Sequence, residues 1–372
     1  MQVNATEYVG ILVNDSLYRG IPRGATGHEA LGWYEEAGAA QQLTPCYFRL
    51  KDIQVRAGTV RAYVRQEGRY VRRRVRVPQV IHNRAIYFTR KARHKLSRLE
   101  RSGRLVFNGW NRHSKLLIHQ IMMENEALRP HLPATEALAP DHLRGMMDRY
   151  DSLILKPASS SIGRGVMKLE REDEGEWALT WRNKGRLVRH RIGAELPLSL
   201  MRKLQARRYV VQQRLPLALL SGRPFDLRVS VQRAGDGAWT VTGIVAKVAA
   251  PDAFVTNVAQ GGSVRQLDAV MADLAEADLE QTRIAIEQFA LRAAEHLSSR
   301  LPHLADVGFD IGLTETGFPM FIECNGRDQR YSFQKGGMPA EWRATFANPI
   351  AYARYLLDAR ASERREAAGP AL

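Results

Sequence analysis

The chain has 372 residues, 45% of them hydrophobic, and a formal net charge of +16 at pH 7. A chain of this length and composition can fold into two or three domains around real cores, which excludes an intrinsically disordered protein. The two cysteines, Cys46 and Cys324, are too few for a disulfide framework or a zinc site, so we expect a reducing, intracellular setting.

We expect no targeting segment at the N-terminus. No run of 18 or more apolar residues occurs in the chain, and its first residues, MQVNATEYVGILVNDS, lack the basic start and the long apolar core of a signal peptide. We therefore expect a cytoplasmic protein with no export and no membrane span.

Positive charge is concentrated in the first third of the chain, in YVRRRVRVP (70–78) and TRKARHKLSRLERSGR (89–104). Such a field attracts nucleic acid, anionic polymers, nucleotides or acidic substrates. However, the arginines of 72–76 alternate with valine, which favours the polar face of a half-buried strand, and no helix-turn-helix, zinc-finger or RNP motif occurs. The pattern favours a solvated basic face over a specific nucleic-acid site.

The first 105 residues are predicted to form a small α/β domain, with apolar strands in YVGILV (8–13) and PQVIHNRAIYF (78–88). A helix is predicted over roughly 112–129, because apolar residues recur there at helical spacing and Pro130 ends the pattern. The segment PHLPATEAL (130–138) then leads to a glycine-bearing hairpin.

That hairpin, LILKPASSSIGRGVMKLE (153–170), places Lys156 at the end of an apolar strand and before a loop of small residues. The Walker phosphate loop has the opposite order, with the lysine after the glycines and at the start of a helix. Here Val166, Met167 and Leu169 instead continue as a strand. The pattern indicates a flexible hairpin tip over a polyphosphate, or alternatively an ordinary surface hairpin with a solvated lysine.

From residue 209 the pattern becomes β-rich. Strands are predicted in YVVQQRL (209–215), FDLRVSVQR (225–233) and AWTVTGIVAKVAA (238–250), with a turn at AGDG (234–237). A polar loop, NVAQGGSV (257–264), and an amphipathic helix near 279–298 follow.

A hairpin is predicted over DVGFDIGLTETGFPMFIECNGRDQR (306–330). It carries the last candidate functional residues along the chain. If Thr316 and Gly317 form a two-residue turn, Asp310 pairs directly with Glu323, and Asn325 points to the same face. Two carboxylates facing each other repel unless a counter-ion is present. Together with the amide they form a hard-oxygen set suited to magnesium, although paired acids on a hairpin can also be simply exposed.

These motifs, in this order, resemble the ATP-grasp superfamily. Within it the chain is most similar to the YheC/YheD family of endospore coat-associated proteins, through stretches such as VIHNR, PHLPAT, LILKPASSSIGRGV, GRPFDLRVSVQ and FIECNGR. The resemblance implies an α/β (α+β) ATP-grasp fold. It divides the chain into a pre-ATP-grasp-like domain (1–105), a subdomain with the phosphate-covering hairpin (106–205), a subdomain with the adenine hinge and magnesium site (206–360) and a C-terminal tail (361–372).

The resemblance also implies roles for individual residues, with ATP and Mg²⁺ as cofactors. Phosphate contacts fall to Lys156 and to the loop containing Ser159, Ser160, Ser161, Gly163 and Gly165. Gln212 and Gln213 are assigned to the adenine hinge, Arg228 and Lys247 to catalysis, Asn257 to phosphate and metal, and Asp310, Glu323 and Asn325 to magnesium.

Three of these residues have plainer alternatives. Arg228 could be a cross-strand ion-pair partner, Lys247 an outward-facing strand residue, and Asn257 the cap of a turn. The sequence departs from many ligases of this fold after the last motif, where it reads GRDQRYSF. This departure suggests that Arg327 and Arg330 bind an acidic group.

The leading functional hypothesis is an ATP- and magnesium-dependent ligase that joins a carboxylate to an amine through an acyl phosphate. The alternatives are a kinase that phosphorylates a hydroxyl, and a non-catalytic coat or scaffold protein that binds ATP or an anionic polymer. Expected partners are ATP and unidentified carboxylate and amine substrates, acidic or polymeric, with no specific nucleic acid. The family resemblance adds an association with the spore coat.

Overall fold

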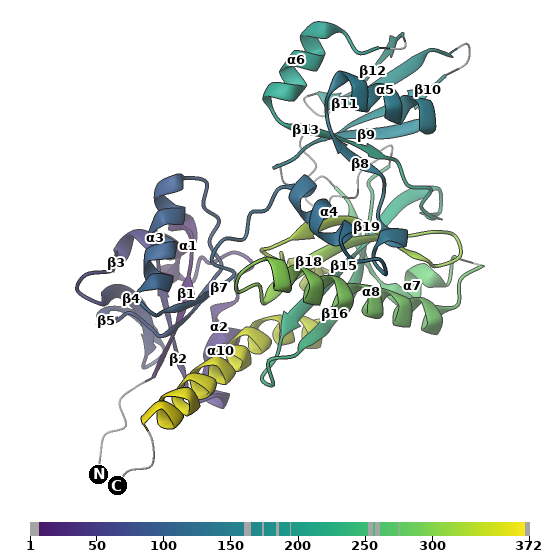
Figure 1. Cartoon of the computed structure of the whole chain (residues 1–372). Coiled ribbons are helices and arrows are strands. Elements are labelled where there is room, and N and C mark those ends of the chain that lie inside the picture. Colours follow the sequence, from purple (N-terminus) through teal and green to yellow (C-terminus); the bar gives the residue numbers. More distant parts are fainter. Residues whose placement is uncertain are drawn as a thin grey trace.

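Three β-sheets follow one another along the chain and form the frame of the molecule (Figure 1). The computed structural model describes residues 7–159, 165–172, 175–183, 186–193, 195–251, 256, 261–274 and 276–368. Helices pack on each sheet, so the predicted mixed α/β class is confirmed. Short 3₁₀ helices lie at Ile21–Arg23, Leu50–Asp52 and Arg129–His131.

The first sheet has the strand order β3-β4-β2-β1-β6-β7, with β5 paired to β4. Its strands are β1 (Tyr8–Leu12), β2 (Thr44–Phe48), β3 (Ile53–Gln54), β4 (Thr59–Gln66), β5 (Arg69–Arg76), β6 (Val80–Asn83) and β7 (Leu105–Phe107). Its helices are α1 (Asp15–Gly20), α2 (Leu31–Ala40) and α3 (Arg90–Arg101). Strands β2, β1, β6 and β7 run parallel, as expected for the short apolar strands of an α/β unit.

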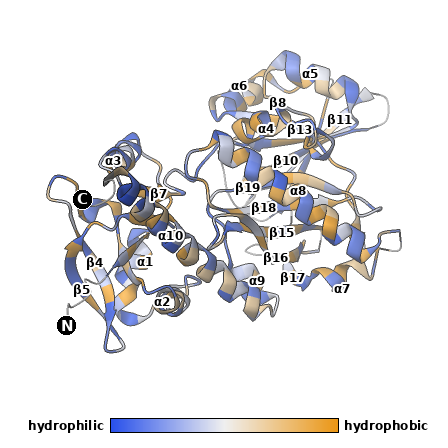
Figure 2. Cartoon of the chain, turned by 60° about the horizontal axis from the view of Figure 1, so that its bottom comes forward, coloured by the Kyte–Doolittle hydropathy of each residue, from blue (hydrophilic) through white to orange (hydrophobic). Residues whose placement is uncertain are grey.

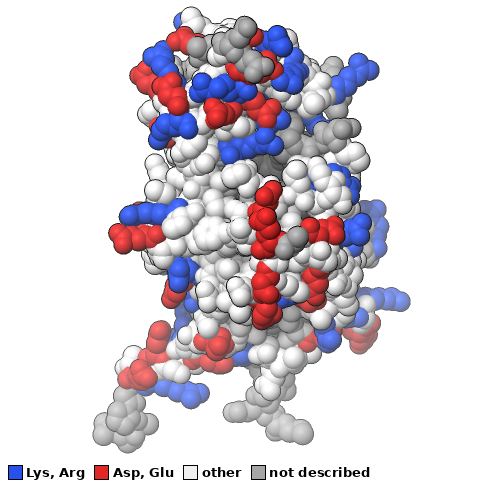
Figure 3. Space-filling model, turned by 90° about the vertical axis from the view of Figure 1, so that its right-hand side faces the viewer, with Lys and Arg blue, Asp and Glu red and all other residues white. Residues whose placement is uncertain are grey.

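The basic segments lie on the outer elements of this first sheet. On β5 the arginines of 72–76 are exposed while Val75 is buried, so the predicted polar face of a half-buried strand is confirmed. Helix α3 is strongly hydrophilic and turns only Leu96 and Leu99 into the core (Figure 2). On the side of the molecule away from this domain, acidic and basic side chains are mixed (Figure 3).

The second sheet is antiparallel, in the order β12-β11-β10-β9-β13-β8. Its strands are β8 (Thr135–Ala137), β9 (Ser152–Pro157), β10 (Met167–Arg171), β11 (Trp177–Asn183), β12 (Arg186–Ile192) and β13 (Tyr209–Gln213), with helices α5 (Pro140–Arg149) and α6 (Leu198–Ala206). Leu153 and Leu155 of β9 enter the core beside these helices. Because strand residues alternate between the two faces, Ile154 and Lys156 face the opposite way, toward a cavity.

The third sheet has the order β17-β16-β15-β18-β19, with β14 paired to β15. Its strands are β14 (Leu219–Leu220), β15 (Arg223–Arg233), β16 (Trp239–Val248), β17 (Ser263–Gln266), β18 (Asp306–Leu313) and β19 (Pro319–Asn325). The helices associated with it are α4 (Lys115–Met123), α7 (Leu267–Met271), α8 (Leu279–Arg300) and α9 (Tyr331–Lys335).

The central strands β15 and β18 have one apolar and one polar face, and both faces are buried. Phe225, Leu227, Val229 and Val231 of β15 pack with α4 and α8 in one core. The intervening residues are polar and also buried, namely Asp226, Arg228, Ser230 and Gln232. On β18, Asp306 and Asp310 occupy the equivalent polar face. The alternation of FDLRVSVQ therefore sets a hydrophobic face against the helices and a charged face against the rest of the protein.

Helix α10 (Pro339–Ala368) connects the third sheet to the first. Its apolar residues Phe346, Ile350, Ala353 and Leu357 join the core of the first sheet. The tail that we expected to begin at residue 361 is therefore helical through Ala368, as the continuation of a long packed helix.

The expected boundary at 205–206 also differs from the observed sheets. Strand β13, which we placed with the later subdomain, pairs with β9 and β8 in the second sheet. In the other direction, α4 packs with α8 on the third sheet although we placed it in the earlier subdomain. The chain thus crosses between these two units more than once, which a division by sequence position cannot represent.

None of the helices in the described part of the chain is both long enough and apolar enough to cross a membrane.

Candidate functional site

Two adjoining cavities lie between the second and third sheets. The larger has a volume of about 570 Å³ and the smaller about 250 Å³. Both are lined by Lys115, Lys156, Glu323 and Asn325, so they form one continuous site with two ends. The larger cavity extends along the strand end that follows Gln213, and the smaller extends toward the first sheet at Ile86 and Phe88.

The closing hairpin of β18 and β19 forms the floor of this site, and Asp310 pairs with Glu323 as predicted. The turn, however, is longer than the predicted Thr316–Gly317 pair. Thr314 and Phe318 close it by a backbone hydrogen bond, and Gly317 adopts a left-handed φ of 81°. A bulge at Ile322 compensates for the extra residue and restores the pairing.

Lys156 reaches across from the second sheet to this bulge. Its Nζ donates to the carbonyl oxygen of Ile322 at 3.3 Å, and only 7% of the residue is exposed. Burial lowers the pKa of the Lys156 ammonium to about 8, although the charge of Glu323 opposes that shift. The lysine is thus a buried cation held on a rigid strand, which excludes the alternative of a solvated surface residue.

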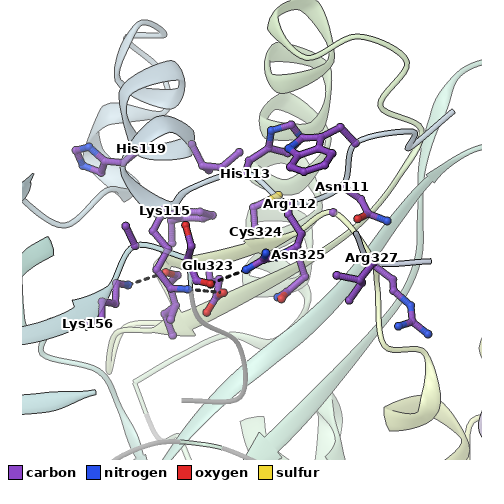
Figure 4. A pocket seen from close by; sticks show the side chains of 18 of the residues that line it. Asn111, Arg112, His113, Lys115, His119, Lys156, Glu323, Cys324, Asn325 and Arg327 are labelled. Carbon is purple, nitrogen blue, oxygen red and sulfur yellow. Dashed lines mark hydrogen bonds and ion pairs between the residues drawn. The ribbon is translucent and has the colours of Figure 1, made fainter. Parts of the chain in front are cut away.

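The three residues predicted to bind metal lie together, but each is already in contact with other groups. Asn325 Nδ2 donates to Asp310 Oδ2 at 3.3 Å. Glu323 forms an ion pair of 2.9 Å with Lys115 (Figure 4). The repulsion that we expected between the two carboxylates is therefore offset, because each has its own cationic partner.

Asp310 is the most heavily contacted of the three. Arg228 binds both of its carboxylate oxygens, at 2.8 and 3.3 Å, and Lys247 Nζ lies 2.9 Å from Oδ1. Burial alone would raise the pKa of Asp310, but Arg228 and Lys247 together lower it well below its usual value. The arginine is thus a cross-strand ion-pair partner of Asp310, as the plainer interpretation expected, and it is also part of the cavity wall; its catalytic role stays a prediction.

Lys247 is buried and does not face solvent, so the alternative of an outward-facing strand residue is wrong. It lies 2.7 Å from Asp226 Oδ1, the residue opposite it in the sheet, as well as close to Asp310. Burial raises the pKa of Asp226 to about 7, with Lys247 opposing the shift. Two buried acids thus share one buried ammonium at the cavity wall.

The ends of the glycine-bearing loop are fixed by neighbouring segments. The Ser159 carbonyl accepts a hydrogen bond of 2.7 Å from Arg112. At Gly165, whose φ is 79°, an added Cβ would lie 2.7 Å from the hydroxyl oxygen of Tyr209. The other predicted loop residues, Ser160, Ser161 and Gly163, lie outside the described residues, as does Asn257.

The two glutamines of β13 lie at the edge of the larger cavity but point to different sides. Gln212 faces the cavity and donates to the Thr135 hydroxyl at 2.7 Å. The Gln213 side chain instead accepts from the backbone N–H of Ala134 at 3.3 Å. Gln213 can therefore contribute to a ligand site mainly through its backbone.

A magnesium ion would find hard-oxygen ligands here. Among the described residues no group of three or more His, Cys, Asp and Glu side chains is arranged to hold a metal. The candidate ligands that the protein offers here are two carboxylates and one amide. This donor set suits an ion that keeps several ligands from water and phosphate. The exposed fraction of the Glu323 side chain is 26%, against 13% for Asp310, so Glu323 is the more accessible of the two carboxylates.

Sequence reasoning missed three residues that contact the predicted ones. Lys115 follows Ser114, which caps α4, and reaches Glu323 from that helix start. Asp226 could have been found, because it shares the polar alternation of β15 with Arg228. Asp328 pairs with Arg228 at 3.0 Å and lies beyond the last strand, where no periodicity indicates its direction.

Arg330 does not bind an acidic ligand in the cavity as we expected. Its side chain is 1% exposed and lies in a second, closed cluster, where Nη2 donates to Asp306 at 2.7 Å and Nη1 to the Tyr34 hydroxyl at 2.8 Å. Its guanidinium also stacks on Phe346. Arg327, in contrast, lines the smaller cavity.

Comparison with known proteins gives a consistent result. A family model described as "YheC/D like ATP-grasp" matches residues 104–356. The chain is 25% identical over 345 residues to the "Endospore coat-associated protein YheD" of Bacillus subtilis (strain 168), covering 87% of this chain and 72% of that protein.

Solved structures share the fold at low sequence identity. The D-cycloserine synthetase DcsG matches with a TM-score of 0.52 and 13% identity, over 93% of this chain and 99% of that one. The VanG D-Ala:D-Ser ligase of Enterococcus faecalis matches with a TM-score of 0.53 and 11% identity, over 94% and 100%. Both similarities concern the arrangement of the elements across almost the full length.

Proposed function

The chain belongs to the YheC/D-like ATP-grasp family, and from this membership we propose that it is an ATP- and magnesium-dependent ligase that joins a carboxylate to an amine through an acyl phosphate. The predicted ATP-grasp fold is confirmed by the solved ligases that share it. The observation that carries the proposal is the convergence of Lys156, Arg228 and Lys247, from three different strands, on the cavity that Glu323 and Asn325 also line.

The proposed reaction needs charge neutralisation more than a protein nucleophile. A carboxylate oxygen of the substrate attacks the γ-phosphorus of ATP and ADP leaves. The amine nitrogen then attacks the carbonyl carbon of the acyl phosphate, loses a proton and expels inorganic phosphate. A buried, water-poor site stabilises the charge that develops on the phosphoryl oxygens better than water does.

Each predicted residue receives a role in this proposal. Lys156 and the loop from Ser159 to Gly165 would bind phosphate oxygens, and Gln212 with the backbone of Gln213 would hold the adenine. Arg228 and Lys247 would stabilise the transferring phosphoryl group. Both contact Asp310 and lie at the cavity wall, where a phosphoryl group could reach them. Asn257 is assigned to phosphate and metal by the family resemblance.

Magnesium, when bound, supplies neutralisation of the phosphate charge. Glu323, Asn325 and Asp310 would hold it. Arg228 holds the pKa of Asp310 below its usual value, which favours the ionised form that a cation needs, and Glu323 lies beside Asp310 with Lys115 as its ion-pair partner.

The test is to titrate the purified protein with ATP and magnesium in a calorimeter, and then to screen pairs of acids and amines for ADP release. A ligase forms ADP, free phosphate and an amide. A kinase forms ADP and a phosphorylated product without free phosphate, which would overturn the ligase assignment. An absence of ATP binding would overturn both enzyme assignments and favour a scaffold protein.

Similarity to YheD supports one finer proposal, an association with the endospore coat. A fluorescently tagged copy produced in sporulating Bacillus subtilis would be expected to collect at the forespore surface. A signal that stays uniform throughout sporulation would overturn this assignment without affecting the ligase proposal.

A further inference from the structure

Arg327 stands at the end of the smaller cavity away from Lys156 (Figure 4). It follows β19 directly after Gly326, whose carbonyl accepts a hydrogen bond of 2.8 Å from Asn108. A Cβ at Gly326 would lie 2.7 Å from the carbonyl oxygen of Asn111, so only glycine allows this close packing. The loop at 108–111 thus holds the backbone from which the Arg327 side chain extends.

Cations outnumber carboxylates around Arg327. The guanidinium groups of Arg84, Arg327 and Arg330 surround the two carboxylates of Glu29 and Asp306. His82, which contacts Asp306, adds no charge near neutral pH, because burial lowers its pKa to about 4 while Asp306 opposes the shift. One positive charge of this set therefore has no carboxylate of its own.

The contact distances show that this surplus charge belongs to Arg327. Arg84 lies 2.8 Å from Glu29, and Arg330 lies 2.7 Å from Asp306. Arg327 reaches Glu29 only at 3.9 Å, and its buried Nε has no hydrogen-bond partner among the described residues. Burial lowers the pKa of Arg327, and the neighbouring charge of Arg84 lowers it further.

Arg327 is also the member of this set that opens on the cavity. Its side chain is 27% exposed, whereas those of Arg84 and Arg330 are 4% and 1% exposed. The walls nearby are aromatic, with Trp110 and His113 lining the cavity and Phe88 at 74% exposure stacked under Arg112. A ligand at this end would meet an apolar wall and the guanidinium of Arg327, whose contact with Glu29 is long. Arg112 also lines this cavity, but it donates to the Ser159 carbonyl and lies over Phe88.

We propose that Arg327 binds a second carboxylate of the substrate, one that is not activated by ATP, so that the enzyme selects substrates with two carboxylates. This inference rests on the proposed function, because that function puts phosphate and magnesium beside Lys156 and Glu323, and the carboxylate that receives the phosphoryl group must then lie at this end of the same cavity. A guanidinium can hold a carboxylate by two parallel hydrogen bonds, which fixes orientation as well as charge. The substrate class is therefore a dicarboxylic acid, such as an acidic amino acid.

The experiment measures the binding of glutarate and of its monocarboxylate counterpart butyrate by calorimetry, in the presence of ADP and magnesium. The wild-type protein should bind glutarate about 10- to 100-fold more tightly than butyrate, the range expected for one charge-assisted contact. Arg327→Gln should abolish this ratio. Arg327→Lys, which keeps the charge but loses the fork, should retain part of it.

Arg300→Gln is the matched control, because it removes one charge from an exposed arginine paired with Glu124 outside both cavities. It should leave the glutarate ratio unchanged. Thermal melting separates recognition from a structural role. Because Arg327 is a surplus cation, Arg327→Gln should melt at the wild-type temperature or above, whereas a large fall would show that the arginine only supports the fold.

Two results would overturn the inference. One is a ratio of glutarate to butyrate affinity that is the same in the wild type and in Arg327→Gln. The other is no binding of glutarate by the wild type. If ATP binds while this ratio is equal, the proposed ligase function stands and the role of Arg327 fails. If ATP does not bind but the glutarate ratio depends on Arg327, the ligase function fails and the anion site stands.

Discussion

Strand β18 carries two buried carboxylates on the same face, and they belong to two different charge clusters. Asp306 lies in the closed cluster, with Arg84, Arg330 and His82, at the junction with the first sheet. Asp310 lies in the open cluster, with Arg228 and Lys247, at the wall of the larger cavity. The same residue type, four positions apart, thus lies once in a closed contact between sheets and once at the wall of a cavity.

In the closed cluster, neutral side chains donate hydrogen bonds to the carboxylates in addition to the ion pairs. Asp306 accepts hydrogen bonds from Arg330 and from Gln232, and the Tyr34 hydroxyl links Arg330 to Glu29. In the open cluster the side chain of Asp310 is 13% exposed, and its partners Arg228 and Lys247 line the cavity with it. This difference teaches that a buried ion network acts as structure when it is closed, and can exchange partners only where it meets a cavity.

The largest expected effect comes from opening the closed cluster. Asp306→Asn leaves Arg84 and Arg330 with Glu29 as their shared carboxylate, and should lower the free energy of unfolding by about 3 to 5 kcal/mol. Asp310→Asn makes the same change on the same strand. Its loss of stability should be partly recovered by ATP and magnesium, because phosphate can replace a carboxylate beside Arg228 and Lys247.

Chemical denaturation of both variants, with and without ATP and magnesium, measures this contrast. The comparison of the two clusters would be wrong if ATP restored Asp306→Asn as fully as it restores Asp310→Asn.

The next effect has the opposite sign. Lys156 has a folded-state pKa of about 8, against an ordinary value of 10.5, so its buried charge costs stability at neutral pH. Lys156→Met should raise the free energy of unfolding at pH 7 by about 3 kcal/mol, while weakening ATP binding by about 10- to 100-fold. A more stable protein that no longer binds ATP would identify Lys156 as a functional cation.

The pH dependence follows from the same shift. Between about pH 8 and 10.5 the unfolded chain keeps the Lys156 proton and the folded chain does not, so this residue makes stability rise with pH in that window. Denaturation midpoints measured from pH 7 to 10 should show a rise in the wild type that Lys156→Met lacks. Parallel curves for the two proteins would contradict the assignment.

A smaller change is expected at Glu323. If Glu323 and Asp310 repelled each other as the sequence suggested, Glu323→Gln would stabilise the metal-free protein slightly. The structure reverses that sign, because Glu323 is a counter-ion of Lys115 at 2.9 Å. We expect Glu323→Gln to cost about 1 kcal/mol or less, since the pair is partly exposed.

The functional result at Glu323 should be larger than this structural one. Turnover should be mostly lost and the magnesium-dependent increase in melting temperature should shrink, while part of the ATP affinity remains through Lys156. Normal ADP release, together with an undiminished magnesium effect, would exclude Glu323 as a metal ligand.

The smallest effect is expected on the first sheet. Residues 1–105 hold 20 of the Lys and Arg residues and only 8 of the Asp and Glu residues, so this region supplies most of the net charge of +16. Replacing Arg72, Arg74 and Arg76 by glutamine should change stability by less than about 0.5 kcal/mol, because these side chains are exposed.

What should change with these arginines is the salt dependence of binding to anionic substrates, since the field acts over roughly 10 Å at 0.1 M salt. Titration at two salt concentrations tests this. An unchanged salt dependence would argue against any steering role, and a loss of ATP binding would show that the nucleotide site had been misplaced.

Local pattern was enough to predict several strands and strand pairings around the cavities. The alternation of FDLRVSVQ predicted the strand on which Arg228 lies, and the spacing in the closing hairpin predicted the pairing of Asp310 with Glu323. The predicted pairing is correct although the predicted turn is not, because the bulge at Ile322 offsets the extra residue of the longer turn. The expected division at residue 205 runs through the second sheet, since strand pairing between β13 and β9 joins segments that sequence position separates.

The sequence by itself determined which residues could share a strand face, because side chains on a strand alternate with a period of two whatever surrounds them. It thereby fixed the candidates Lys156, Arg228, Asp310 and Glu323. Only the tertiary structure decided what each charge meets. Glu323 pairs with Lys115, which lies 208 residues away along the chain. Arg330 is enclosed, whereas Arg327 is open to the cavity. Burial and pairing depend on segments that are distant along the chain, and those two quantities decide whether a charge supports the fold or a ligand.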